Sequence, residues 1–373
     1  MKKYFWFAVL VACVQCAYAQ TEQKEVKATL LNYIEGTSYN HPNLIKKAFF
    51  EKANLYLTNK EKKLWIVPAE EYAGFFEKGE KGKFNGRIGN ILSVDIEEDV
   101  ALAKVEILIP AKDTRFVDVF LLKKVEGNWK IMSKSATKHE SNKSGDRILF
   151  IVSNAHFYGN SDIGTGNSFP EIVSAYNTFE KAGYTVDFVS PKGGAVPLTY
   201  INLSNPLQKE YFYNNDFIAA LKATKTPKEI NPSHYKAVHY IGGGSAMFGV
   251  PEDKEIQAIA MSVYEDNQGI ISSVCHGTAG IVNLKTKEGK YLVAGKRVNG
   301  YPDAYENKKA SSFKHHPFLI QKTIEERGGT FKYSDRRKAH VEVDGKLVTG
   351  QNYQSSAPVA QKIIELLERS EVN

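Results

Sequence analysis

The sequence has little cysteine and no long apolar run beyond its first residues. Only three cysteines occur in 373 residues, and two of them, Cys13 and Cys16, stand in the apolar N-terminal segment. Removal of that segment would leave Cys275 alone, which excludes a disulfide within the shortened chain. No later run approaches the roughly 20 apolar residues that a membrane-spanning helix needs.

Basic blocks and phosphate-binding loops are also lacking. The formal net charge is +7 at pH 7, and the excess is spread along the chain, unlike the clustered charge of nucleic-acid binders. Gly242-Gly243-Gly244 lacks the Lys and Ser/Thr of a phosphate loop, and His315-His316 has no carboxylates at ligand spacing. We therefore expect no cofactor, metal or nucleic-acid partner, and a simple loop around the two histidines.

The first residues have the features of a secretory signal peptide. Two lysines precede an apolar stretch from Tyr4 to Val14, and Ala17-Tyr18-Ala19 forms a small-x-small cleavage pattern. We expect cleavage after Ala19 and export to the periplasm or beyond the cell. The alternative is a lipoprotein anchored through Cys13, which ends a Leu-Val-Ala-Cys run.

Length and composition predict two domains, because 373 residues exceed what one compact core usually serves. The polar stretch from Ala136 to Asp146 has no apolar periodicity and separates two strand-like segments. We expect a signal peptide, a smaller α+β domain, a linker and an α/β domain, at residues 1–19, 20–139, 140–146 and 147–373. No internal repeat is present.

The smaller domain is predicted as helices laid across a curled antiparallel sheet. Apolar residues from Val26 to Ile34 have helical spacing, an irregular section follows, and a short helix is expected near Glu70 to Phe76. Alternating apolar and polar residues then predict four strands, at Arg87 to Val94, Val100 to Ile109, Phe116 to Lys124 and Trp129 to Met132.

This part resembles the nuclear-transport-factor-like superfamily, especially its lumazine-binding-like branch, which implies a cone-shaped fold. Phe116 to Phe120 and Gly127 to Ile131 carry the resemblance, which covers about Glu22 to His139. Because the fold serves enzymes, ligand binders and dimerisation modules alike, we assign it no catalysis; capture of a small ligand or homodimer formation stays open. Asp118 and His139 are candidate pocket residues, although a solvated sheet-face aspartate and a linker histidine are simpler interpretations.

The larger domain alternates strands and helices, a pattern typical of a parallel sheet flanked by helices. The continuous apolar run Ile148 to Val152 is typical of a strand buried on both faces. Strands and helices are expected to alternate thereafter, at Pro170 to Ala182, Tyr184 to Val189, Ala237 to Ile241, Asp253 to Asn267, Ile270 to Val274, Leu347 to Thr349 and Ala357 to Leu367. Function in such folds lies at the carboxyl ends of the strands.

Cys275 is the leading candidate for a reactive residue. It follows the apolar strand Ile270 to Val274 and precedes small residues through Gly280, which predicts a sharp strand-to-helix turn with sulfur at its apex. The helix dipole and free backbone N–H groups at such a turn favour the thiolate. The alternative is an ordinary core cysteine.

Several short motifs in fixed order resemble the PfpI superfamily of glutamine-amidotransferase-like folds. They are Thr165-Gly166 with Glu171, Ser190 to Gly194, Gly242 to Gly244, Val274 to Gly277, Pro302-Asp303 and Thr349 to Asn352. The resemblance covers Arg147 to Glu368 and implies a flavodoxin-like α/β fold. Within the superfamily, the chain is most similar to the heat-shock-type branch associated with glutathione-independent glyoxalase (glyoxalase III) and with chaperone or deglycase activity.

The resemblance also implies roles for individual residues. Cys275 would be the nucleophile, Glu171 the acid that faces it, His276 the adjoining histidine and Asp303 the carboxylate that orients it. Their types also permit plainer interpretations, since acidic residues are common at helix starts and in turns. The plainer interpretation of His276 is that it caps the helix after Cys275 or packs against it.

The chain departs from the heat-shock-type branch at two places. That branch has Gly-Gly-His-Gly where this chain has Gly242-Gly243-Gly244-Ser245, and tryptophan-aspartate where this chain has Phe248-Gly249. The first change removes a histidine near the nucleophile, and the second alters a pocket wall.

The implied activity is conversion of a 2-oxoaldehyde such as methylglyoxal to a 2-hydroxy acid. A thiolate adds to the aldehyde carbon, a proton moves between neighbouring carbons, and a thioester is hydrolysed. Backbone N–H groups of the Gly243-Gly244 turn and of His276 would bind substrate and stabilise the oxyanion. Alternatives are a cysteine-dependent hydrolase or deglycase, a stress holdase chaperone, or a ligand-binding protein with a degenerate site.

The segment from Leu198 to Lys228 has two interpretations. It is rich in aromatic residues, with Tyr200, Tyr211, Phe212 and Tyr213. It would either form a wall over Cys275 or be a packed excursion from the fold.

Overall fold

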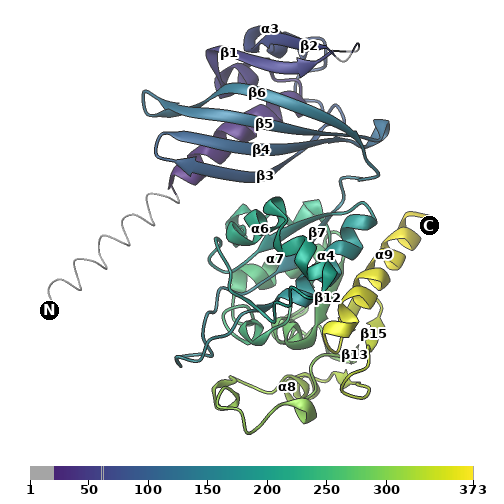
Figure 1. Ribbon diagram of the computed structural model, residues 1–373. Helices are drawn as coiled ribbons and strands as arrows, with labels where there is room; N and C mark the ends of the chain where they lie inside the picture. The colour runs from purple at the N-terminus through teal and green to yellow at the C-terminus, as the bar shows by residue number, and fades with distance from the viewer. Residues whose placement is uncertain (1–20, 60, 62, 373) are drawn as a thin grey trace, which may run out of the picture. The chain divides into compact units, whose positions relative to one another are not determined.

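The computed structural model describes residues 21–59, 61 and 63–372, in two compact units that divide between Lys143 and Ser144 (Figure 1). The expected signal peptide, with Cys13 and Cys16, lies outside the described residues. No helix within the described part of the chain is long and apolar enough to span a membrane.

The first unit is a six-stranded sheet with a helix across one face. Helix 21–38 comes first, followed by α2 (Pro42–Ala48), β1 (Phe49–Thr58), β2 (Leu64–Pro68), α3 (Ala69–Gly74), β3 (Ile88–Glu97), β4 (Val100–Ile109), β5 (Thr114–Val125) and β6 (Asn128–Glu140). The strand order is β2-β1-β6-β5-β4-β3. The β1–β6 pair is parallel and the other pairs are antiparallel.

Two sequence expectations for this unit need correction. The section expected to be irregular contains α2, β1 and β2. The register between β1 and β6 shifts between Phe49 and Asn54, which breaks the alternation that marks a strand in sequence. In addition, β6 continues to Glu140 within the polar stretch, because its ladder with β5 needs backbone groups rather than apolar side chains.

The second unit is an α/β sandwich around a mostly parallel sheet. Its principal elements are β7 (Arg147–Ile151), α4 (Phe169–Lys181), β9 (Thr185–Val189), α5 (Pro206–Phe212), α6 (Asn215–Lys222), β11 (Tyr235–Tyr240), α7 (Lys254–Glu265), β12 (Ile270–Val274), α8 (Ile320–Glu326), β15 (Val341–Asp344), β16 (Leu347–Gly350) and α9 (Ser356–Val372). The sheet order is β15-β16-β12-β11-β7-β9, and only β15 runs antiparallel to its neighbour. The parallel α/β prediction is confirmed.

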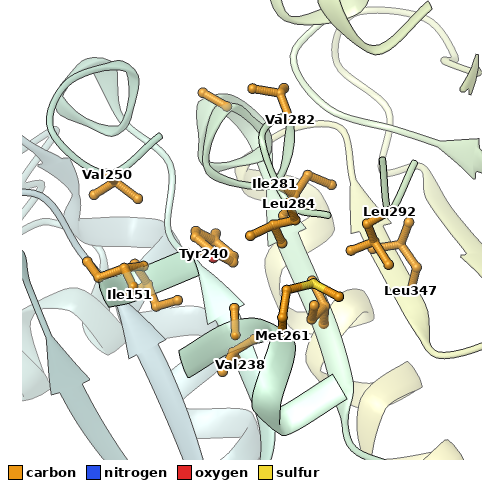
Figure 2. Packing of buried hydrophobic residues seen from close by; sticks show 14 of the residues in the cluster. Ile151, Val238, Tyr240, Val250, Met261, Ile281, Val282, Leu284, Leu292 and Leu347 are labelled. Atoms are coloured by element: carbon orange, nitrogen blue, oxygen red, sulfur yellow. The ribbon is translucent and has the colours of Figure 1, made fainter. Parts of the chain in front are cut away.

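Each face of this sheet has its own apolar core. Leu149 and Val238 belong to a core that also contains side chains of α7 and α8, and Figure 2 shows Val238 near Met261 of α7. The alternating residues Ile148 and Ala237 face α4 and α9 instead. A strand buried on both faces has no polar alternation, which is why Ile148 to Ile151 of β7 form a continuous apolar run. The two cores fix the strands whose carboxyl ends carry the candidate site.

Candidate active site

Cys275 lies at a sharp turn at the carboxyl end of β12. Its φ is +55°, a left-handed conformation that costs a non-glycine residue about 1–3 kcal/mol. A 3₁₀ helix, Cys275–Ile281, begins at the cysteine itself. Gly277 is required two residues later, because a Cβ there would collide with the backbone of Tyr240. The predicted strand–turn–helix geometry is confirmed, and Cys275 is 8% exposed.

Glu171 faces this thiol from the first turn of α4. It is 3% exposed, its Oε2 accepts the N–H of Gly242 at 3.0 Å, and it shares hydrogen bonds with Cys275 and the Ser168 hydroxyl. Burial raises its pKa to about 7, although the charge of His276 and these hydrogen bonds limit the rise. A carboxyl group that gains and loses its proton near neutral pH is suited to proton transfer.

The thiol itself does not have the low pKa that the turn led us to expect. Burial raises the pKa of Cys275 well above its usual range, and the charge of Glu171 raises it further. The hydrogen bond from the backbone N–H of His276 opposes this effect without overcoming it. The expectation of a resting thiolate is therefore wrong, and the sulfur needs a base, which Glu171 is placed to supply.

His276 connects the thiol to a carboxylate that the sequence analysis did not identify. Its Nδ1 lies 3.5 Å from the Cys275 sulfur, and its Nε2 lies 2.9 Å from Oε1 of Glu306. Burial acts to raise the pKa of Glu306, but the hydrogen bond and charge of His276 outweigh it and lower the pKa. Cys275, His276 and Glu306 thus form a cysteine–histidine–carboxylate series.

Asp303, expected to orient the histidine, has another role. Its carboxylate accepts the backbone N–H groups of Gln321 and Lys322, both at 3.0 Å, where α8 begins. A short 3₁₀ turn, Asp303–Tyr305, separates it from Glu306. Asp303 therefore caps the start of α8, and Glu306, three residues later, lies beside His276. The assignment of Asp303 as the orienting carboxylate is wrong.

The Gly242-Gly243-Gly244 turn lies against the same site. A Cβ at Gly242 would collide with Glu171 and Cys275, and Gly243 has a φ of +99°. The N–H of Gly244 stands at the start of the 3₁₀ helix Gly244–Met247, where no intrahelical acceptor exists. Gly242 therefore places the start of this turn against the nucleophile, and the oxyanion role of the next two residues, Gly243 and Gly244, stays a prediction.

Tyr158 occupies the space beside Gly244. A Cβ at Gly244 would overlap the Tyr158 hydroxyl and approach Oγ1 of Thr165 to 2.5 Å. Position 244 is the one at which the heat-shock-type branch has its histidine. In this chain a tyrosine hydroxyl from the loop after β7 fills the region into which that side chain would extend.

Aromatic rings enclose the histidine side of the site. Tyr301 stacks on His276 with centroids 4.5 Å apart, and Tyr158 stacks on His316 at 5.9 Å. The His316 ring is edge-on to His276. Although His316 lies beside Glu306, no group of three or more metal-ligating side chains occurs among the described residues.

Both interpretations of the segment from Leu198 to Lys228 hold, each for a different part of it: one part borders the site and another is a packed excursion. Tyr200 is 64% exposed, has a φ of +60°, and lies close enough to Cys275 and Glu171 for electrostatic interaction with both. Tyr211 is 4% exposed and packs on Phe217 with centroids 5.0 Å apart. One end of the segment therefore borders the site, and α5 and α6 pack against the core.

Sequence reasoning identified Cys275, Glu171 and His276, and the structure brings them together. It missed Glu306. The only feature that could have indicated this residue is its position three residues after Asp303. It gave no signal for Tyr158, whose place depends on the path of a loop.

Comparisons with known proteins agree with this architecture. Residues 21–135 match a family described as putative lumazine-binding, so the first unit has the lumazine-binding-like fold of the nuclear-transport-factor type. A glutathione-independent glyoxalase of Schizosaccharomyces pombe is 31% identical over 60% of this chain and 98% of its own length. Glyoxalase 3 of Candida albicans is 31% identical over 55% of this chain and 90% of its own length.

Solved structures match the second unit. The crystal structure of glyoxalase III from Candida albicans superposes with a TM-score of 0.55 and 28% identity, over 60% of this chain and 98% of that protein. Residues 165–366, more than half of the chain, match the DJ-1/PfpI family. With the cysteine turn, the facing glutamate and the flavodoxin-like sheet in place, the chain belongs to the DJ-1/PfpI family.

Proposed function

We propose that the protein converts 2-oxoaldehydes, with methylglyoxal as the type substrate, to 2-hydroxy acids without glutathione. The observation that carries the proposal is the direct pairing of the Cys275 thiol with Glu171, a buried carboxyl group whose pKa is raised to about 7 by burial. The glyoxalases similar to this chain over nearly their whole length support the choice of reaction.

The first step forms a carbon–sulfur bond. The Glu171 carboxylate takes the thiol proton as sulfur attacks the aldehyde carbon, so a buried charge is not needed on sulfur before substrate arrives. The aldehyde oxygen becomes an alkoxide, which the N–H groups of the Gly243-Gly244 turn and of His276 stabilise. Protonated Glu171 then donates its proton to that oxygen, which yields a hemithioacetal and restores the carboxylate.

The second step moves a proton between neighbouring carbons. Glu171 removes the hydrogen of the former aldehyde carbon as a proton, and the electron pair moves onto the adjacent ketone oxygen to give an enediolate. The proton of the neighbouring hydroxyl group then passes to that oxygen. Return of the proton to the former ketone carbon leaves a thioester of a 2-hydroxy acid. One carbon is oxidised and its neighbour is reduced, so no external oxidant or reductant is required.

The last step releases product. Water adds to the thioester carbonyl, and His276, held by Glu306 at 2.9 Å, is placed to accept its proton. Collapse of the adduct breaks the carbon–sulfur bond and returns the proton to sulfur. The hydroxy acid leaves and the thiol is restored.

The direct test is production of D-lactate from methylglyoxal without glutathione, by the intact protein and by Cys275→Ala. We expect turnover by the first and only the background rate with the second, while the two thermal melts stay similar. Turnover that survives in Cys275→Ala, or no turnover by either protein, would refute the proposal.

We also propose that the protein is exported, on the evidence of the apolar N-terminal segment and Ala17-Tyr18-Ala19. The mass and N-terminal sequence of the mature protein test this, with Gln20 expected as the first residue. A mature chain that begins at Met1 would contradict export, and a lipid-modified Cys13 would replace cleavage after Ala19 by lipid anchoring.

A further inference from the structure

The first unit contains a buried polar cluster on the helix-covered side of its sheet. Asp118 is 1% exposed and Lys134 is 4% exposed, so the expectation that Asp118 is a solvated sheet-face residue is wrong. The helix 21–38 covers this side of β5 and contributes Tyr33, which is fully buried. Tyr72 of α3 completes the cluster.

The polar groups of this cluster pair with one another. Lys134 Nζ lies 3.0 Å from the Asp118 carboxylate and donates to the Tyr33 hydroxyl at 2.6 Å. The Tyr33 hydroxyl donates to Asp118 at 2.6 Å. One positive and one negative charge therefore compensate each other, and the cluster forms a closed, neutral floor.

Arg87 adds a positive charge above this floor. It precedes β3 and lies close enough to Tyr33 for its charge to act on the phenol. Its guanidinium stands 5.7 Å from the ring centroid of Phe76 and 6.0 Å from that of Phe116. The Nε atom is shielded from solvent and has no hydrogen-bond acceptor in the described part of the chain.

A buried side-chain nitrogen without a hydrogen-bond acceptor, such as Nε of Arg87, is uncommon in folded proteins. Stacking on aromatic rings satisfies the faces of a guanidinium, but it leaves the in-plane Nε–H of Arg87 without an acceptor in the described part of the chain. Arg115, the other arginine of this unit, shows the usual arrangement, because its Nε donates to the Glu106 carboxylate at 2.5 Å. Arg87 has no such carboxylate among the described residues.

The residues around Arg87 are partly exposed. None of the residues of β3 is fully buried, and Phe76 and Phe116 are only partly buried where they pack against the core. The floor below them is closed. This side of the sheet therefore has a polar base, an uncompensated cation and an apolar aromatic rim.

We propose that Arg87 is the anchor of a binding site for a small aromatic or apolar monocarboxylate. The planar fork of the guanidinium matches a carboxylate through two parallel hydrogen bonds, and Phe76 and Phe116 would contact the apolar part of the ligand. The single uncompensated charge favours a monoanion over a phosphate ester, because Lys134 is already paired with Asp118.

Isothermal titration of the full chain with benzoate, and with its neutral analogue benzamide, tests this site. We expect benzoate to bind, benzamide to bind at least tenfold more weakly, and Arg87→Gln to weaken benzoate binding at least tenfold. Lys123→Gln is the charge-matched control, since this surface lysine pairs with Asp99 and its substitution is expected to leave the affinity unchanged.

Two further variants keep the test decisive. Cys275→Ser should bind benzoate like the unmodified chain, which separates this site from the thiol site of the second unit. If Arg87→Gln does not melt cooperatively, Arg87→Lys replaces it, with at least threefold weaker binding expected because lysine lacks the bidentate fork. Absence of benzoate binding, equal binding of benzamide, or unchanged affinity in the Arg87 variant would overturn the proposal.

Discussion

Two buried carboxylates of the second unit differ in what surrounds them. Asp187, on edge strand β9, lies 2.6 Å from Nη1 of Arg147 and 3.0 Å from Nζ of Lys225, and it accepts the Tyr235 hydroxyl at 2.9 Å. Burial alone would raise its pKa, but the two cations outweigh burial and lower it. This carboxylate stays charged and holds strand ends together.

Glu171 is buried to a similar degree with the opposite result. Its direct contacts are the Gly242 amide, the Ser168 hydroxyl and the Cys275 thiol, and burial raises its pKa to about 7. Burial thus penalises both carboxylates, and the partners decide the outcome. Direct cationic contacts make a structural ion cluster, whereas neutral contacts leave a group able to exchange protons at neutral pH.

The largest expected effect is loss of turnover in Glu171→Gln. The amide retains the shape and an acceptor for the Gly242 N–H but cannot take a proton from sulfur or carbon, so kcat/KM should fall by about 10³-fold. In the unmodified protein, kcat/KM should rise as pH increases toward about 7, where Glu171 ionises, and then level off. Steady-state rates from pH 5 to 9 measure both, and a full rate in Glu171→Gln would contradict the assignment.

The same substitution makes a prediction about stability. A carboxyl group with a folded-state pKa of about 7 and an unfolded value near 4.3 destabilises the fold progressively between these pH values. Below that window it costs nothing, and above it the cost is about 4 kcal/mol. Glu171→Gln should therefore gain stability relative to the unmodified protein from pH 4.5 to 8. Denaturant melts at both pH values test this, and a constant difference would argue against the raised pKa.

Asp187→Asn should lower the stability of the fold at neutral pH, the opposite of the effect expected for Glu171→Gln. The substitution removes the carboxylate charge that faces Arg147 and Lys225, and we expect the free energy of unfolding at pH 7 to fall by about 3–5 kcal/mol. Because the folded-state pKa of Asp187 is lowered, this difference should shrink as the pH falls below about 4. Turnover of folded protein should stay near normal, and a large loss of kcat would break the comparison.

The smallest expected effects separate Glu306 from Asp303. Glu306→Gln weakens a charge-assisted hydrogen bond to His276 worth about 1.5–3 kcal/mol, so kcat should fall roughly 10- to 100-fold. Asp303→Asn should leave kcat unchanged and cost about 1 kcal/mol of stability through the start of α8. The reverse result would restore Asp303 as the orienting residue.

Patterns along the chain predicted much of the fold and part of the site. An uninterrupted apolar run identified β7, since a strand buried on both faces needs no polar residues. Ile270-Ile271 followed by small residues identified β12. Small residues after Cys275 identified the turn, because only a few sequences permit so sharp a bend. The register shift between Phe49 and Asn54 hid β1, as periodicity cannot follow a strand across an irregular ladder.

What the sequence by itself determined was the alternation of elements, the position of the nucleophile and the presence of acidic residues near it. Only the tertiary structure decided that Glu306 rather than Asp303 supports His276, that the thiol is buried enough to need a base, and that Arg87 lacks an anionic partner. The reason is physical: the pKa of a group and the partner of a charge depend on the distances and burial created when distant segments pack, which local spacing does not encode.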